Sequence, residues 1–355
     1  MSFTKIIKID PLCPNADYLK LKEAAEILAK GGLVIIPTET VYGIAANMLN
    51  KNTIDRLYEI KQRPKDKPFS LHIDDKIMIE EFAKDIPVCA YKLIDKFWPG
   101  PLTVILKSRG QGTVGLRMPD DEIALKVISQ ARVPVVCPSA NISGKSAPVN
   151  FEEAIKDLNG KVECALDCGR TRLGQESSVV DVTVEPLRIL REGAIKKEDI
   201  ELLAKKKIVL FVCTGNSCRS VMAKGLLEKK LKEKGRSDVE VLSAGVMMLG
   251  GLGASDETKE LLQQEGIDVS IHRSQRVTRA MIKKSDIILV MEKLHEERTL
   301  ELVPEVKNRL FLLKEFAKIN DNNLDTIDPI GKSIEFYSQT FAIIKEAVER
   351  IVTII

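Results

Sequence analysis

Apolar residues follow one pattern in the first part of the chain and a different one in the second. In the first part, helical apolar spacing over Leu19–Lys30 stops at a Gly-Gly pair, and the buried-strand run Leu33–Pro37 follows. Further short β-rich runs lie at Leu102–Leu106, Val133–Cys137 and Val179–Val182. Because helices and strands do not alternate strictly here, the pattern predicts an open, twisted, partly antiparallel sheet rather than a barrel.

The second part begins with Ile208–Val212, a wholly apolar run that predicts a buried strand. Helical and strand patterns then alternate. We expect helices at Val221–Lys234, Asp256–Glu265, Arg279–Ser285 and Ile334–Val352, and strands at Val239–Leu242, Ile287–Met291 and Arg309–Leu313. This order predicts a doubly wound α/β block with a parallel sheet. The charged stretch Ile195–Lys207 predicts a short helical connector, so we place the boundary between the blocks near residue 200.

Composition narrows the class of protein. The 355 residues correspond to two domains of ordinary size, and 44% hydrophobic with 30% charged residues excludes a disordered chain. A net charge of +3 argues against a bulk polyanion binder. No apolar run approaches the roughly 20 residues of a membrane helix, and the N-terminus lacks the apolar core of a secretory signal. We therefore expect a cytoplasmic protein that does not act at a membrane.

The cysteines and histidines do not form a metal-binding pattern. Seven cysteines are scattered through the chain without a Cys-x-x-Cys pair, and three histidines are present. This makes a zinc site unexpected, and no metal ligands are assigned. Cys164 and Cys168 lie in an apolar, strand-like stretch and are expected to be core thiols.

The sharpest chemical motif is the segment Cys213–Ser220, between the expected strand and helix. At such a junction, successive backbone N–H groups and a helix N-terminus point at one place and form an anion site. Cys213, which opens the loop, is expected to have a lowered pKa and to exist largely as the nucleophilic thiolate. Arg219 can hold two phosphate oxygens in a bidentate pair. Ser220 can donate to the sulfur, and Asn216 suits a left-handed position.

Phosphoryl transfer to a thiolate also needs an acid for the leaving group. Asp328, before a proline in a loop far along the chain, is our candidate, and Asp325 is a weaker substitute. With this acid, the second block resembles the low-molecular-weight protein tyrosine phosphatase family over residues 207–355. The resemblance implies that family's doubly wound parallel sheet, with Cys213 attacking phosphorus, Arg219 binding phosphoryl oxygens and Asp328 protonating the leaving group.

The same resemblance implies the composition of the phosphate loop and a redox property. Cys218 matches the family's second loop cysteine, which can form a protective disulfide with the nucleophile. The remaining loop residues are Thr214, Gly215, Asn216, Ser217 and Ser220. Arsenate reductases of the same fold need further cysteines downstream. None follows Cys218, so we do not expect an arsenate reductase.

Two departures from the tyrosine-specific pattern bear on the substrate. Ser217 stands where those enzymes carry a bulky Ile, and Ile330 stands where they carry an aromatic residue after Asp-Pro. Both changes remove apolar walls for a phenol ring. A branch that acts on protein phosphoarginine has a small hydroxyl residue at the loop position, so we favour a phosphoarginine-containing protein as substrate. Phosphotyrosine remains the alternative, as does a phosphate-reading pseudoenzyme.

The first block has no Gly-rich phosphate loop of the standard types. It has four polar segments in apolar surroundings: 37–43, 61–68, 138–144 and 177–181. In this order they resemble the YrdC-like threonylcarbamoyl-adenylate synthase family over residues 5–195, and so imply a synthase domain at 1–200. That family condenses L-threonine, bicarbonate and ATP, for which Mg²⁺ is expected, in the first step of a tRNA modification. The resemblance implies tRNA or tRNA-modification proteins as partners.

Carried over position by position, the resemblance assigns two groups of residues. The ATP-binding group is Lys61, Arg63, Ser139 and Arg191, with Thr113 and Ser143. The threonine-binding group is Thr38, His72, Arg117 and Ser177. The alternative for His72 is a purely structural role. Neither the residues nor the resemblance identify a general base for the synthase step. The alternative for this block is an RNA-binding module with a cationic cleft and no synthase activity.

Overall fold

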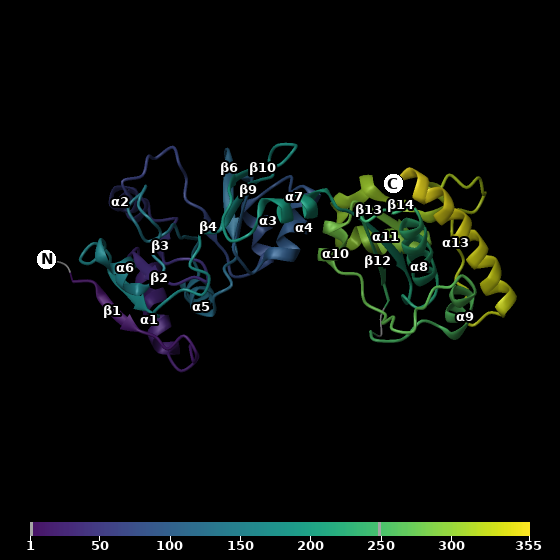
Figure 1. Cartoon of the computed structure of the whole chain (residues 1–355), viewed down its shortest axis with the longest axis horizontal. Coiled ribbons are helices and arrows are strands. Elements are labelled where there is room, and N and C mark those ends of the chain that lie inside the picture. Colours follow the sequence, from purple (N-terminus) through teal and green to yellow (C-terminus); the bar gives the residue numbers. More distant parts are fainter. Residues whose placement is uncertain (1–2, 248–249) are drawn as a thin grey trace. The chain divides into compact units, whose positions relative to one another are not determined.

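The computed structural model describes residues 3–247 and 250–355. The chain divides into two compact units, residues 1–204 and residues 205–355, and each has its own sheet and its own hydrophobic core (Figure 1).

The first unit is built on a large mixed sheet. In its described residues ten strands pair in the order β1-β8-β2-β3-β7-β4-β6-β5-β9-β10, with both parallel and antiparallel neighbours. The strands are β1 Lys5–Lys8, β2 Val34–Ile36, β3 Gly43–Asn47, β4 Leu71–His72, β5 Leu102–Lys107, β6 Thr113–Arg117, β7 Val135–Val136, β8 Cys164–Asp167, β9 Ser178–Asp181 and β10 Arg188–Arg191. Several are only two or three residues long, so side chains from many strand ends reach the same region.

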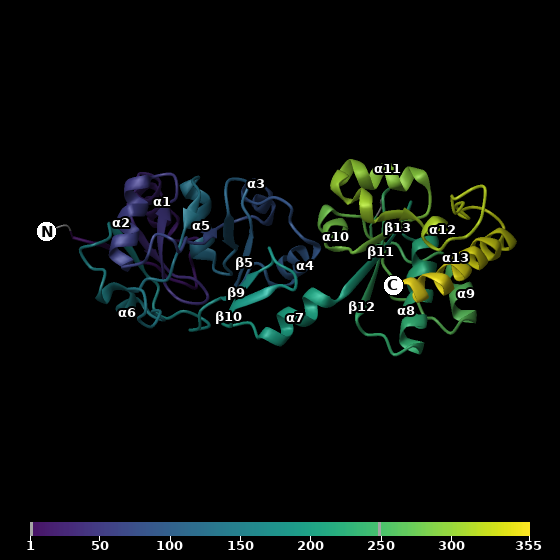
Figure 2. The same cartoon turned by 90° about the horizontal axis from the view of Figure 1, so that it is seen from above.

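Helices cover both faces of this sheet. One core lies beneath α1 and α5, which pack together, and a second core lies on the other face (Figure 2). The helices are α1 Tyr18–Ala29, α2 Lys51–Lys61, α3 Ile79–Phe82, α4 Val88–Phe97, α5 Glu122–Ala131, α6 Phe151–Lys156 and α7 Lys197–Lys205, with a 3₁₀ turn at Lys76–Met78. Asparagine or aspartate side chains cap α2, α5 and α6 at their N-termini, which fixes where those helices begin.

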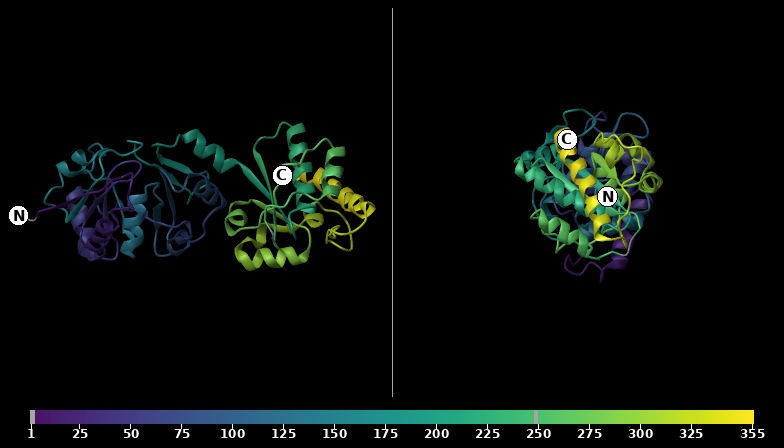
Figure 3. Two further views of the ribbon diagram at one scale, coloured as in Figure 1. Left: turned by 90° about the horizontal axis from the view of Figure 1, so that it is seen from below. Right: turned by 90° about the vertical axis from the view of Figure 1, so that its right-hand side faces the viewer.

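The second unit has a four-stranded, wholly parallel sheet in its described residues, in the order β12-β11-β13-β14. Its strands are β11 Lys207–Cys213, β12 Val239–Gly245, β13 Ile287–Val290 and β14 Leu310–Leu312. Its helices are α8 Arg219–Glu233, α9 Asp256–Gln264, α10 Arg279–Lys284, α11 Lys293–Leu302, α12 Leu313–Phe316 and α13 Ile334–Ile354, with a 3₁₀ segment at Pro304–Arg309. The long helix α13 packs on α8 on one face, and α10 and α11 cover the other (Figures 2 and 3).

This topology determines where a ligand can bind in the second unit. The chain leaves β11 for β12 on one side and then crosses to β13 on the other, so the carboxyl end of β11 is a topological switch point. In open parallel sheets, ligands bind in the crevice at that point. Cys213 is the last residue of β11 and therefore lies at this switch point.

The fold class expected from the sequence is confirmed: a mixed sheet with helices in one block and a doubly wound parallel sheet in the other. The expected strand Arg309–Leu313 is shorter, because a 3₁₀ segment occupies its start and a helix begins at its end. Cys164 and Cys168 are buried. Among the described residues, no helix is long and apolar enough to cross a membrane.

Two candidate active sites

The segment 213–219 wraps around the sulfur of Cys213 between β11 and α8. Cys213 Sγ lies 3.0 Å from the Ser220 hydroxyl and accepts the backbone N–H of Asn216 at 3.2 Å. Asn216 adopts a φ of 55°, in the left-handed region. Its side chain donates to the hydroxyls of Ser220 and Ser243 at 3.0 Å each, and its amide oxygen accepts the N–H of Gln275. This asparagine therefore braces the turn from both sides.

Arg219 reaches back across the loop and is 1% exposed. Its NH1 donates to a Glu292 carboxylate oxygen and to the Thr326 carbonyl, both at 2.7 Å. Its NH2 donates to the Thr214 hydroxyl at 3.0 Å and to the Asp328 carboxylate. Nε is buried and has no hydrogen-bond partner among the described residues.

The structure thus brings Cys213, Arg219 and Asp328 to one loop, although Asp328 is 109 residues from Arg219 in sequence. Asp325, the weaker candidate acid, lies elsewhere: its carboxylate accepts the backbone N–H of Lys293 at 3.0 Å, at the start of α11. The geometry favours Asp328.

The expected lowering of the Cys213 pKa is wrong. Burial raises the pKa of this thiol, while Arg219, the Ser220 hydroxyl and the Asn216 N–H act in the opposite direction. The physical reason is that the sulfur is almost wholly buried and that the charge of Arg219 is already compensated by two carboxylates.

Glu292 and His295 are site residues that the sequence reasoning missed. Glu292 pairs with Arg219, and His295 Nε2 lies 2.9 Å from the Thr214 hydroxyl. A signal was present, because both residues directly follow the buried strand β13 next to β11. Polar residues at the carboxyl edge of a central parallel strand are site candidates.

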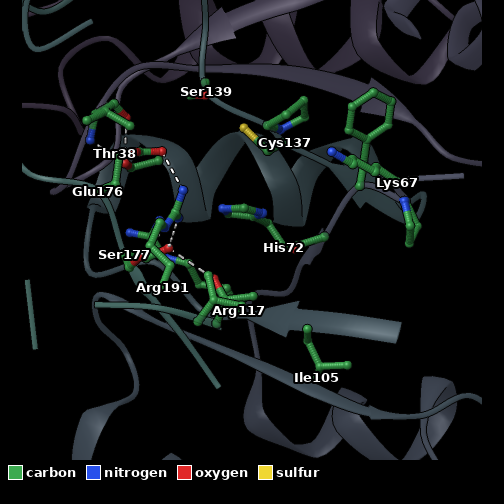
Figure 4. A pocket seen from close by; sticks show the side chains of 18 of the residues that line it. Thr38, Lys67, His72, Ile105, Arg117, Cys137, Ser139, Glu176, Ser177 and Arg191 are labelled. Atoms are coloured by element: carbon green, nitrogen blue, oxygen red, sulfur yellow. Dashed lines mark hydrogen bonds and ion pairs between the residues drawn. The ribbon is translucent and has the colours of Figure 1, made fainter. Parts of the chain in front are cut away.

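The first unit has a cavity of about 400 Å³ (Figure 4). Several of the sequence-assigned residues line it, together with residues that were not assigned. The assigned lining residues are Thr38, Arg63, His72, Arg117, Ser139, Ser177 and Arg191, and the unassigned ones include Asp66, Lys67, Cys137 and Glu176. The structure therefore gathers residues of both assigned groups around one cavity.

Three residues of the ATP-binding group are not among the described residues that line this cavity. Lys61 is 2% exposed, and its Nζ donates to the carbonyl oxygens of Ser139 and Asn141. Burial and nearby Arg63 lower the pKa of Lys61 to about 8. Ser143 is exposed and donates its N–H to the Lys61 carbonyl at 2.9 Å, and Thr113 is exposed at the start of β6. Lys61 thus holds the 139–141 turn in place beside the cavity.

Arg117 is held from behind by a buried carboxylate. Its NH2 lies 2.7 Å from a Glu39 carboxylate oxygen and 2.9 Å from the Thr40 hydroxyl. His72 pairs with Arg117 across the β4–β6 ladder and points into the cavity (Figure 4). Burial and Arg117 lower the pKa of His72 to about 3, so its ring is neutral. Its Nδ1 has no hydrogen-bond partner among the described residues.

Arg191 lies on β10 at another side of the cavity. It donates from Nε to the Ser177 carbonyl at 2.9 Å and from NH2 to the Ser177 hydroxyl at 3.1 Å, and its NH1 pairs with Glu176 at 2.5 Å. These contacts hold the guanidinium in one orientation at the cavity wall.

Comparison with known proteins accounts for both units. A family model described as "Telomere recombination" (Sua5, YciO, YrdC) matches residues 26–193, and the model of the low molecular weight phosphotyrosine protein phosphatases matches residues 208–355. A putative threonylcarbamoyl-AMP synthase of Methanocaldococcus jannaschii is 36% identical over 54% of this chain and 94% of its own. A protein-arginine-phosphatase of Geobacillus stearothermophilus is 41% identical over 36% of this chain and 82% of its own. The chain belongs to both families.

Longer relatives of the Sua5 family match only in part. The threonylcarbamoyl-AMP synthase of Pyrococcus abyssi is 42% identical over 58% of this chain, which spans 64% of that relative, slightly under two thirds of its length. The structure of P. abyssi Sua5 complexed with L-threonine aligns with 87% of this chain and 99% of its own, at 29% identity and a TM-score of 0.54. The Sua5 fold thus agrees with the mixed sheet of the first unit.

The close approach of β12 to the phosphate loop yields a prediction. A Cβ at Gly245 would lie 2.7 Å from the Thr214 carbonyl oxygen and 3.0 Å from the Asn216 nitrogen. Gly245→Ala should therefore displace the loop and weaken inorganic phosphate binding roughly tenfold or more, measured by calorimetry. Gly253→Ala is the control, because its Cβ would meet no described atom within 4 Å. Equal phosphate affinity in both variants would contradict the prediction.

Proposed function

We propose that the second unit hydrolyses phosphorylated side chains of proteins through a cysteinyl-phosphate intermediate. The observation that carries this proposal is the meeting of Cys213, Arg219 and Asp328 at one loop. A nucleophile held by hydrogen bonds, a cation for the phosphoryl oxygens and a carboxyl group for the leaving atom are the three parts that such a reaction needs.

The proposed reaction has two steps. Cys213 Sγ attacks phosphorus as a thiolate, the bond from phosphorus to the substrate nitrogen or oxygen breaks, and that atom takes the proton of Asp328. The Asp328 carboxylate then takes a proton from water, the water oxygen attacks phosphorus, and the P–S bond breaks to release inorganic phosphate. The Ser220 hydroxyl, 3.0 Å from the sulfur, can stabilise the departing thiolate.

For this unit we propose phosphoarginine as the substrate group, with phosphotyrosine as the second candidate. The protein-arginine-phosphatase relative supports the first choice, and the family's description supports the second. Ser217 belongs to the phosphate loop and Ile330 follows Asp328-Pro329 and is exposed, and neither supplies an aromatic side chain for a phenol ring. The Asp328 carboxylate, which already binds one guanidinium here, is suited to a second one in the substrate.

Replacing the nucleophile tests the chemistry. Cys213→Ser should abolish turnover of phosphorylated protein while inorganic phosphate still binds, because Arg219 and the loop N–H groups remain. Phosphate release and calorimetry measure the two properties. Residual turnover close to that of the unchanged protein would contradict a cysteinyl-phosphate intermediate.

Substrate choice is tested at the loop. The unchanged protein should release phosphate faster from phosphoarginine-containing protein than from phosphotyrosine-containing protein. Ser217→Ile should shift the ratio of kcat/KM values towards phosphotyrosine by roughly tenfold, because the added apolar wall contacts a phenol ring. A clear preference of the unchanged protein for phosphotyrosine would favour the second candidate.

We infer that the first unit forms threonylcarbamoyl-AMP from L-threonine, bicarbonate and ATP. The observation that carries this proposal is the cavity lined by Arg63, Lys67, Arg117 and Arg191, which can hold a carboxylate and a triphosphate together. The relatives named threonylcarbamoyl-AMP synthase and the L-threonine complex of P. abyssi Sua5 support it.

Positioning accounts for most of the proposed synthase chemistry. Arg117 is oriented to bind the threonine carboxylate, and Arg63 and Arg191 to bind phosphates. The threonine amine and bicarbonate give a carbamate and water; the carbamate oxygen then attacks the α-phosphorus, and pyrophosphate leaves. Mg²⁺ would neutralise and orient the triphosphate, and the carboxylates of Asp66 and Glu176 in the cavity lining are oxygen ligands of the kind it takes.

The product defines the partners that we propose for this unit. Threonylcarbamoyl-AMP carries an activated threonylcarbamoyl group, which a later step transfers to adenosine in tRNA. We therefore propose tRNA, or the proteins that modify it, as partners of the first unit. The alternative is an RNA-binding module without synthase activity, which would not release pyrophosphate from ATP when threonine is added.

Pyrophosphate release from ATP should depend on L-threonine and bicarbonate. Arg191→Ala should raise the KM for ATP roughly tenfold, because it removes a bidentate phosphate ligand. Arg188→Ala is the matched control: it lies on the same strand, pairs with Asp181 and is outside the cavity lining. RNA binding without threonine-dependent pyrophosphate release would overturn the synthase proposal.

A further inference from the structure

His295 is a wholly buried histidine at the edge of the phosphate loop that the hydrolysis described above does not use. It lies in the first turn of α11 and is 0% exposed. Its Nδ1 accepts the backbone N–H of Glu292 at 3.0 Å, and its Nε2 lies 2.9 Å from the Thr214 hydroxyl oxygen. One imidazole therefore connects the cap of a helix to the catalytic loop.

The protonation state of this ring follows from its surroundings. Burial and the neighbouring Arg219 lower the pKa of His295 to about 4, although Asp328 and Asp325 act in the opposite direction, so the ring is neutral near pH 7. Since Nδ1 accepts a backbone N–H, the single ring proton must be on Nε2. His295 is then the donor in its contact with Thr214, and the Thr214 hydroxyl oxygen is the acceptor.

The same hydroxyl oxygen accepts a second hydrogen bond, from Arg219 NH2 at 3.0 Å. A hydroxyl has two acceptor lone pairs, and His295 and Arg219 occupy both. The threonine oxygen is thus fixed by the histidine, and it in turn fixes one N–H of the arginine. Rotation of the Thr214 side chain would break both hydrogen bonds.

Arg219 has five N–H donors, and the contacts with the protein determine which of them can bind a phosphoryl group. Three are held by protein groups that stay in place: Glu292, the Thr326 carbonyl and the Thr214 hydroxyl. The fourth, on NH2, is on Asp328, and the fifth, on Nε, has no partner among the described residues. Nε and the NH2 donor now on Asp328 are adjacent and suit two phosphoryl oxygens.

We infer that His295 is a positioning residue of the phosphatase site: through the Thr214 hydroxyl it holds the Arg219 guanidinium so that its Nε–NH2 edge faces the phosphoryl group. The inference rests on the phosphatase function proposed for the second unit. His295 touches neither the sulfur nor the substrate in this arrangement and exchanges no proton in the reaction.

If His295 only capped α11, it would stabilise the helix without affecting Arg219. Two amide replacements distinguish this role from positioning. In His295→Asn the side-chain oxygen can still accept the Glu292 N–H, but the donor to Thr214 is lost. In His295→Gln the longer amide can still donate to Thr214, while the acceptor for the cap is lost. Thr214→Val removes the hydroxyl with little change in shape.

We expect His295→Asn and Thr214→Val each to lower kcat on a small aryl phosphate, and inorganic phosphate affinity, roughly tenfold. The double variant should lose little more than either single one, because both remove the same contact. His295→Gln should keep most of kcat with a lower melting temperature. The pH–rate profile of His295→Asn should keep both the acidic and the basic limb of the unchanged protein's profile, because the His295 ring is neutral near pH 7 and exchanges no proton in the reaction.

Thr299→Ala is the matched control for the stability of α11. Thr299 is buried in the same helix and donates to the His295 carbonyl at 2.7 Å, so its loss should lower the melting temperature without the loss of kcat. The inference is overturned if His295→Asn retains the kcat and phosphate affinity of the unchanged protein, or if its profile loses a limb.

Failure of the proposed function and failure of this inference give different results. If the unchanged protein hydrolyses no phosphorylated substrate, the phosphatase proposal fails, and phosphate affinity by calorimetry still reports on the positioning of Arg219. Nitrogen NMR of the unchanged protein supplies a second readout. A protonated Nε2 and a bare Nδ1 on His295 from pH 5.5 to 8 are expected, and the opposite tautomer contradicts the inference.

Discussion

The buried charge of Arg219 is the constraint around which the site of the second unit is arranged. A guanidinium that is 1% exposed is strongly destabilising unless it is paired and hydrogen-bonded. Segments from separate parts of the chain therefore meet it at the carboxyl edge of the parallel sheet: Glu292 follows β13, and Asp328 comes from the loop before α13. The phosphate loop contributes the Thr214 hydroxyl itself. One side chain thus holds together three loops that are distant in sequence.

The first unit also has a buried arginine, Arg117, whose charge must be paired. Arg117 presents its charge to the cavity while Glu39, which is buried, compensates it from behind. His72 beside it stays neutral because its burial and the charge of Arg117 both disfavour a second cation. The cavity wall therefore carries a guanidinium that Glu39 holds in place and a neutral imidazole next to it. A net charge of +3 for the whole chain could not reveal either feature, because the charges that matter are few and individually placed.

The phosphate loop and the residues carried over from the family resemblances, Asp328 among them, could be predicted from the sequence, whereas partners outside those motifs, such as Glu292 and His295, were missed. The loop from Cys213 to Ser220 carries its own geometry in the order of its residues, so its anion site could be inferred before any fold was known. Glu292 pairs with Arg219 and Glu39 with Arg117, each far away in sequence. The position of Glu292 after a central strand marks it as a site candidate but does not identify its partner. Lys61 is expected from the resemblance to bind ATP. In the structure its Nζ donates to backbone carbonyls beside the cavity, a contact that its place in the sequence does not reveal.

The pairing of Arg219 with Asp328 also orders the events of the proposed hydrolysis. Two carboxylates pair with one guanidinium, so a phosphoryl dianion can bind there only if one carboxylate gives way. Glu292 is held in the capping box of α11, whereas Asp328 lies in a loop and occupies the donor that the substrate needs. Asp328 is therefore the group that moves. The displacement of Asp328 that admits the substrate also frees its carboxyl group from Arg219, so the group can face the leaving atom.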